Sequence, residues 1–191
     1  MKVALICLLG VLPCALYAET YGNCDNPFHA PVSPGTELSM TLRSGEVTIE
    51  GSDAAAITVT CRLKGRERPE DVRISFVANH LTVRGGDHDG VEYRIEIPRS
   101  MHLRVKCTAG DLSISGVTGN KEVSLNAGDL RIAVGDPNDY REVEASVLAG
   151  DISAPAFGAS RDGLFRKLRR HSDRGRYRLT ASLLAGDLTL R

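Results

Sequence analysis

A basic segment near the carboxyl end carries the clearest binding chemistry in this sequence. Residues 161–178 hold eight basic and two acidic side chains, a net charge of +6, whereas the whole 191-residue chain is neutral. Guanidinium groups bind phosphates and carboxylates in a bidentate manner, and apolar residues among them suit lipid headgroups. The segment therefore predicts a docking surface for anionic lipid or glycan, formed by Arg161, Arg166, Lys167, Arg169, Arg170, Arg174, Arg176, Arg178 and Phe165.

A structural role for the same segment is the alternative. Its charges would then pair with acidic strands, while Phe165 and Leu168 would cover an apolar end of the fold. Nucleic acid is a disfavoured partner for a chain that is expected to be exported and has no net charge.

Four aspartates recur at one position of a repeated motif, which raises the question of a metal site. Each follows a glycine, in the pairs Gly110-Asp111, Gly128-Asp129, Gly150-Asp151 and Gly186-Asp187, and a looser copy has Gly45 before a glutamate. If the copies stack, the carboxylates form a column with a step of about 4.8 Å, and calcium prefers such oxygen ligands. Short acidic residues after glycine are also ordinary turn residues that accept backbone hydrogen bonds. The nine-residue calcium-roll pattern is absent, so we favour structural turns and expect no metal and no cofactor.

The sequence lacks the common catalytic motifs. It contains no G-x-S-x-G, H-E-x-x-H, G-x-x-x-x-G-K-[ST] or G-x-G-x-x-G pattern. Residues 85–90, Gly-Gly-Asp-His-Asp-Gly, resemble a calcium loop but lack the distal glutamate. We expect them to form a loop between strands, with His88 exposed. The sequence thus favours a non-catalytic protein; the alternative is a carbohydrate-active enzyme with an unrecognised pair of carboxylates.

The elements that must position these residues are repeated strands. Residues 105–112, 123–130, 145–152 and 181–188 share one pattern, and residues 40–47 are a looser copy. Apolar and polar residues alternate before each Ala-Gly-Asp, as in a strand with one buried face. The glycines are spaced by 18, 22 and 36 residues, a period close to one coil of a β-solenoid. The prediction is an all-β solenoid with coils of 18–22 residues, and the alternative is an antiparallel β-sandwich.

The remaining chain fits one domain with few helices. Further strands are expected over residues 37–42, 47–50, 57–63, 72–77, 80–84 and 91–97, with Pro98 ending the last. The one short helix candidate lies at residues 163–170, in a segment expected to project as a loop or distorted coil. The predicted domain covers residues 36–191, after a lead-in over residues 19–35.

Three motifs resemble a known family. The sequence Tyr-Arg-Ile-Glu-Ile-Pro at residues 93–98, Leu-Arg-Val at 103–105 and the repeated Ala-Gly-Asp-Leu/Ile are similar to the bacterial putative-adhesin family of cell-envelope β-solenoid proteins. The segments at residues 163–166, 175–178 and 185–190 also resemble the last coil of that family. The likeness covers residues 36–191. It implies a single-stranded, right-handed solenoid outside the cytoplasm and brings no catalytic residues.

The first residues predict export. Lys2 precedes an uncharged apolar run over residues 3–12, and Ala18 offers a small residue at a cleavage site. This arrangement is typical of a secretory signal peptide over residues 1–18, and the run is short for a membrane span. Cleavage leaves Cys24, Cys61 and Cys107, which allow one disulfide whose pairing stays open. The predicted protein is therefore an extracytoplasmic structural or adhesive module, in the periplasm, in the envelope or secreted, with an envelope component as partner.

Overall fold

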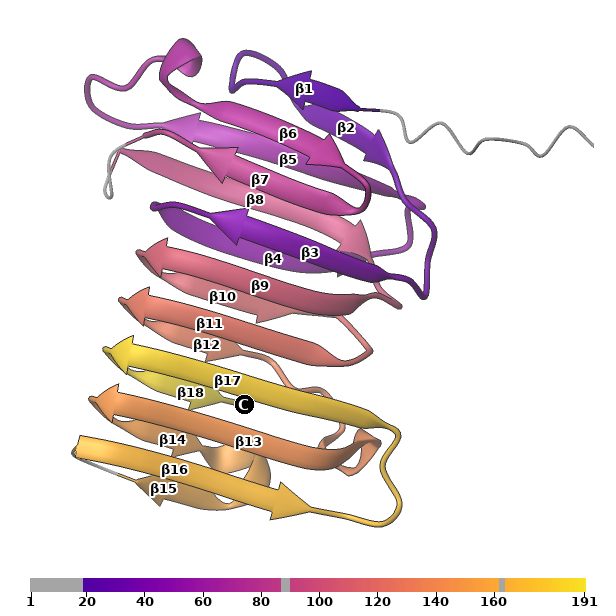
Figure 1. Cartoon of the computed structure of the whole chain (residues 1–191), viewed down its shortest axis with the longest axis vertical. Helices are drawn as coiled ribbons and strands as arrows, with labels where there is room; N and C mark the ends of the chain where they lie inside the picture. Colours follow the sequence, from indigo (N-terminus) through magenta and orange to yellow (C-terminus); the bar gives the residue numbers. More distant parts are fainter. Residues whose placement is uncertain (1–18, 87–89, 162–163) are drawn as a thin grey trace, which may run out of the picture.

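Alternating apolar and polar residues form β-strands over most of the chain. The structure, a computed structural model, describes residues 19–86, 90–161 and 164–191. Within these residues the strands form two nine-stranded sheets that lie face to face (Figure 1). The neighbours in sheet A are, in order, β1 (Thr20–Gly22), β6 (Arg73–Val77), β7 (His80–Arg84), β3 (Glu37–Leu42), β9 (His102–Ala109), β11 (Lys121–Ala127), β17 (Tyr177–Ala185), β13 (Tyr140–Ala149) and β16 (Leu164–His171). Those in sheet B are β15 (Ala159–Arg161), β14 (Ile152–Ala154), β18 (Leu188–Leu190), β12 (Leu130–Ile132), β10 (Leu112–Ser115), β4 (Glu46–Ser52), β8 (Val91–Pro98), β5 (Ala56–Leu63) and β2 (Phe28–Pro31).

The repeated motifs stack in parallel register at the centre of both sheets. In sheet A, Val123 of β11 lies opposite Val105 of β9 on one side and Ala181 of β17 on the other. In sheet B, the residues after each Ala-Gly-Asp align in the same way, as Leu112 with Leu130 and Leu130 with Leu188. Equal positions of the motif therefore form straight rows across the strands.

The whole arrangement is sandwich-like rather than a solenoid. The prediction of a single-stranded right-handed solenoid fails because the strands do not follow one another in chain order. The pair β17 and β18 lies between β11–β12 and β13–β14, and β3 and β4 lie between β7–β8 and β9–β10. Antiparallel pairs occupy both ends of the stack, such as β6 with β7 and β13 with β16. The alternative, an antiparallel sandwich, is correct in that two sheets face each other. The strands at the centre of each sheet, however, pair in parallel.

The basic segment forms a strand, which corrects two predictions. The sequence predicts a short helix or a projecting loop here, but residues 164–171 form β16, an edge strand of sheet A. Leu168 lies opposite Ala145 of β13 and is buried. Period-two alternation of Arg166, Leu168 and Arg170 toward the interior, together with pairing to β13, prevails over the local helix pattern.

The predicted strands of the first half are present with ends that agree within two residues, and Pro98 is the last residue of β8. The lead-in over residues 19–35 contains β1 and β2, which pair with β6 and β5. A disulfide joins Cys24, between these strands, to Cys61 of β5, whereas Cys107 is a buried free thiol. Helical structure in the described residues is confined to three 3₁₀ turns, η1 (Pro69–Asp71), η2 (Pro137–Asp139) and η3 (Pro155–Phe157).

The space between the sheets is filled by the apolar phase of the strands. Leu103, Leu125 and Leu183 of sheet A face Leu130 and Leu188 of sheet B, and all are buried. Among the described residues, Lys121 is the one charged side chain that is buried, with 1% of its surface exposed.

Candidate functional site

The glycines of the motif form a column of tight turns at one rim of the sandwich. Gly45, Gly110, Gly128, Gly150 and Gly186 all have positive φ, a region that favours glycine. The column follows the order of the strands, since Gly128 packs on the carbonyl of Gly110 and Gly186 packs on that of Gly128. Backbones approach here too closely for a side chain.

The aspartates beside these glycines bond to one another's backbone. Asp111 Oδ1 accepts the amide of Asp129 at 3.2 Å, Asp129 Oδ1 accepts that of Asp187 at 3.3 Å, and Asp187 Oδ1 accepts that of Asp151 at 3.1 Å. Arg131 also lies 2.7 Å from Asp129 Oδ2 and 3.6 Å from Asp111 Oδ2. In the part of the chain that the structure describes, no group of three or more His, Cys, Asp or Glu side chains could hold a metal ion. The residues at 87–89, with His88, lie outside the described residues.

Calcium is expected to leave the melting temperature nearly unchanged. The column carboxylates already accept amides, and Arg131 neutralises two of them. A ligand that binds only the folded state raises the free energy of unfolding by RT ln(1 + L/Kd), where L is the free ligand concentration, so a site filled at millimolar calcium would raise the melting temperature. Differential scanning fluorimetry with and without millimolar calcium measures the effect, and we expect a shift below about 1 °C. A rise of several degrees that a chelator reverses would contradict the structural role.

The basic segment lies along β16 and the turn that follows it, and part of its charge is neutralised. Arg169 pairs with Glu144 at 2.7 Å and Arg178 with Glu142 at 2.6 Å. Arg170 donates to the carbonyl of Pro137 at 3.2 Å and stacks on Phe157.

The other basic side chains of the segment differ in exposure. Lys167 and Arg174 are exposed and have no ion-pair partner among the described residues, whereas Arg176 stacks on Tyr177. Arg166 is partly buried and its Nε has no hydrogen-bond partner, and Arg161 ends β15. Inward charges and lysine on an edge strand prevent pairing with other chains.

Exposed apolar side chains form a row on the outer face of sheet A. Leu184 of β17, Leu148 of β13 and Phe165 of β16 occupy matching positions across three neighbouring strands, with 52%, 43% and 78% of their surfaces exposed. We call these three residues the apolar row. Leu164, also exposed, adjoins it, and Phe165 has a φ of 55°. The structural alternative predicted that Phe165 and Leu168 both cover an apolar end of the fold. Leu168 is buried as that alternative requires, but Phe165 is exposed and does not cover the core.

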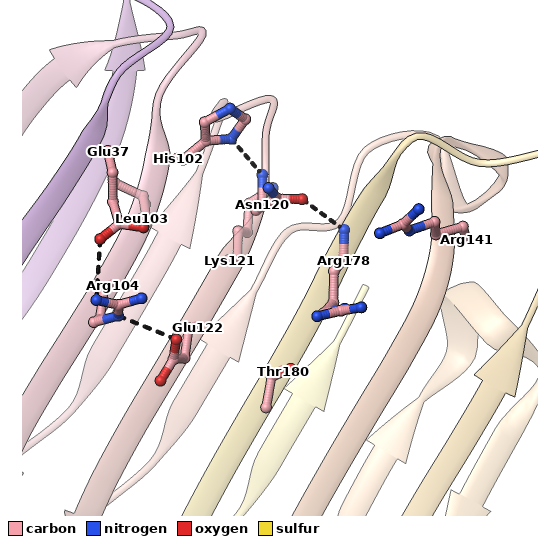
Figure 2. A pocket seen from close by; sticks show the side chains of 10 residues that line it. All are labelled: Glu37, His102, Leu103, Arg104, Asn120, Lys121, Glu122, Arg141, Arg178 and Thr180. Atoms are coloured by element: carbon pink, nitrogen blue, oxygen red, sulfur yellow. Dashed lines mark hydrogen bonds and ion pairs between the residues drawn. The ribbon is translucent and has the colours of Figure 1, made fainter.

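A groove crosses the outer face of sheet A at the opposite rim, where β3, β9, β11, β17 and β13 begin (Figure 2). Its volume is about 210 Å³. One side is closed by charge pairs, because Arg104 bridges Glu37 and Glu122, each at 3.1 Å. Polar side chains line the rest, namely His102, Asn120, Arg141, Arg178 and Thr180. We call this feature the arginine groove.

Lys121 lies beneath the groove and points into the core. It donates a short hydrogen bond to the hydroxyl of Tyr140, which in turn lies 3.4 Å from the carbonyl of Val134. Burial lowers the pKa of Lys121 to about 8 and raises that of Tyr140. Tyr177 contacts the ring of Tyr140 and that of His102, so the buried pair adjoins the groove wall.

One cluster of acidic side chains on sheet B lies beside basic side chains. Glu46 and Glu92 both lie beside Lys64, and Glu50 pairs with Arg94. The Lys64 ammonium holds the pKa of Glu92 below its usual value. A general acid needs a carboxyl group whose pKa is raised, so this cluster does not support the enzyme alternative.

Phe165 and Arg178 were named from the sequence, but the other residues of the apolar row and of the arginine groove were missed. The position before Ala-Gly-Asp is threonine at 108 and asparagine at 126, yet leucine at 148 and 184. That contrast between the copies could have revealed the apolar row. Lys121 similarly replaces the leucine found at 103 and 179. Arg141 left no such signal, since it lies outside the repeated motif.

Comparisons with known proteins give limited support. The sequence matches no family model and no curated protein, so the resemblance to the putative-adhesin family rests on its motifs alone. The structure is similar to that of a putative cell adhesion protein from Clostridium sporogenes ATCC 15579, at a TM-score of 0.49 and 10% sequence identity, over 86% of this chain and 98% of that chain. We draw no functional conclusion from a likeness at this level. In the described part of the chain, no helix has the length and apolarity needed to cross a membrane.

Proposed function

We propose that this chain is an exported, non-catalytic adhesive module that docks onto an anionic lipid surface through β16 and the apolar row. The observation that carries the proposal is the apolar row itself, which continues onto a basic edge strand. Contiguous exposed apolar side chains are typical of interaction surfaces. Export is supported by the Cys24–Cys61 disulfide, since such bonds persist in oxidising compartments.

The charge beside the row favours a lipid surface over a neutral protein partner. Lys167 follows Phe165 by two residues on β16 and is exposed, and Arg174 is exposed in the turn after β16. A basic side chain near an anionic bilayer contributes about 1 kcal/mol. The row adds burial of apolar surface at about 25 cal/mol per Å², so the two terms act together.

Co-sedimentation with phosphatidylglycerol-containing vesicles tests this proposal. We expect binding at low salt that weakens at high salt, because ionic strength screens the basic side chains. The variant Leu148→Thr/Phe165→Asn/Leu184→Asn copies the polar residues of the neighbouring strands and should reduce binding at least tenfold. Asparagine also tolerates positive φ, so the change at residue 165 should not unfold β16.

A matched pair of charge variants separates local from general electrostatics. Lys167→Ser/Arg174→Ser should weaken vesicle binding, whereas Arg43→Ser/Lys106→Ser removes the same charge from the end of β3 and from β9 and should not. The proposal is wrong if the triple variant binds vesicles as well as the unaltered protein. It is also wrong if purified acidic glycan, but not lipid, retains the protein.

A further inference from the structure

Arg141 occupies an unusual position at the rim of the arginine groove. Tyr140 lies opposite Tyr177 and Glu142 lies opposite Arg178, so Arg141 is the extra residue of a β-bulge in β13. Bulges redirect a side chain and occur often beside functional sites. Figure 2 shows the Arg141 side chain extending toward the start of β17, where Arg178 lies.

The turn after β16 holds this bulge in place. The amide of Ser172 donates to the carbonyl of Arg141 at 2.7 Å, and that of Arg176 donates to the carbonyl of Asp139 at 2.8 Å. Gly175 packs so closely that a Cβ there would lie 2.1 Å from the Arg141 nitrogen. The backbone at Arg141, and with it the direction in which the side chain leaves β13, is therefore held by contacts with this turn.

The charges at this end of the groove are unbalanced. Arg178 pairs with Glu142 through its Nε, whereas Arg141 has no ion-pair partner among the described residues and is exposed. Two neighbouring guanidinium groups with one carboxylate favour a further oxyanion, which arginine binds through paired N–H donors.

Uncharged hydrogen-bonding groups surround that end. His102 Nδ1 accepts the amide of Asn120 at 3.0 Å, so in the neutral ring the proton lies on Nε2, which remains a donor. Asn120 Oδ1 accepts the amide of Arg178 at 2.9 Å, which leaves its NH₂ group as a donor. Thr180, two residues after Arg178 on β17, adds a hydroxyl to the lining of the groove. Such groups recognise hydroxyls. The groove is smaller than the pockets of roughly 300–1,000 Å³ that hold drug-sized ligands, so a single sugar unit suits its size.

We propose that the arginine groove binds a carboxylate-bearing sugar of an acidic polysaccharide, with Arg141 and Arg178 on the carboxylate and His102, Asn120 and Thr180 on the hydroxyls. This site is separate from β16 and the apolar row. It gives the protein a second ligand besides the lipid surface, and this ligand is recognised by shape and hydrogen bonds.

Calorimetric titration with trigalacturonate tests the assignment. We expect saturable binding that weakens at least tenfold when the ligand is methyl-esterified and at least tenfold in Arg141→Gln. Thr180→Val keeps the size and strand preference of the side chain, and it should weaken binding several-fold. Arg43→Gln, an exposed arginine at the opposite rim of sheet A, is the matched control and should bind as the unaltered protein does.

The outcomes distinguish this site from a general anion site and from the lipid surface. Absent binding of trigalacturonate, equal binding of the ester, or full binding by Arg141→Gln would each overturn the proposal. Inorganic phosphate that binds as tightly as trigalacturonate, with no effect of Thr180→Val, would overturn sugar recognition. Arg141→Gln should keep its melting temperature and its vesicle binding, so failure here leaves the docking proposal to its own test.

Discussion

Gly128→Val should lower the free energy of unfolding more than any surface substitution. Gly128 has a φ of +121°, and a Cβ there would lie 2.2 Å from the carbonyl oxygen of Gly110. A β-branched residue in this region of φ costs of order 1–3 kcal/mol, and the contact with rigid backbone adds to that cost. We expect a loss of roughly 4 kcal/mol in the free energy of unfolding, measured by urea denaturation.

Gly135→Ala is the control that separates the two causes. Gly135 also has positive φ, at +78°, but a Cβ there would meet nothing within 4 Å. This variant should lose only about 1 kcal/mol, the cost of the backbone conformation alone. Equal losses in the two variants would mean that the stacked turns do not limit the packing of the strands.

Lys121→Met should stabilise the protein at neutral pH. Burial lowers the pKa of Lys121 to about 8, whereas a lysine in an unfolded chain titrates near 10.4. Below pH 8 the folded protein must hold a buried charge, at a cost of roughly 3 kcal/mol. Methionine removes that cost but leaves the Tyr140 hydroxyl with only the Val134 carbonyl, so the gain at pH 7 should be nearer 2 kcal/mol.

The pH dependence gives the sharper measurement. Between pH 8 and about 10.4 the unfolded state binds the extra proton, so the penalty from Lys121 disappears as pH rises. Burial raises the pKa of the Cys107 thiol to about 11, which lowers stability over an overlapping range of pH. The difference between the two proteins isolates the lysine, because Cys107 is common to both. The free energy of unfolding of Lys121→Met, relative to that of the unaltered protein, should fall by roughly 3 kcal/mol between pH 7 and 10.5. A difference that stays constant with pH would contradict a charged Lys121 in the core.

Local features of the fold could be predicted from the sequence because they depend on neighbouring residues. Alternation identified strands such as β3 and β8, and the Ala-Gly-Asp motif marked the turns. The order of the strands could not be predicted in this way. Copies of one motif are nearly interchangeable as neighbours, so the glycine spacing does not reveal that Gly186 lies between Gly128 and Gly150.

The two candidate surfaces depend on that hidden order. Leu184 and Leu148 become neighbours only because β17 lies beside β13, and Arg178 reaches Glu142 and the Arg141 bulge for the same reason. The helix expected at residues 163–170 failed on similar grounds. Its alternation is short, and only pairing with β13 selects the strand.

The central position of β17 and β18 has a consequence for how the protein reaches its native state. These strands are the last described along the chain, yet they separate β11–β12 from β13–β14 in both sheets. During synthesis, the segment from β13 to β16 cannot join the earlier strands until residues 177–190 have followed it. Contacts between residues far apart in sequence form slowly, so the nascent chain should stay open, and accessible to chaperones, until its final strands emerge.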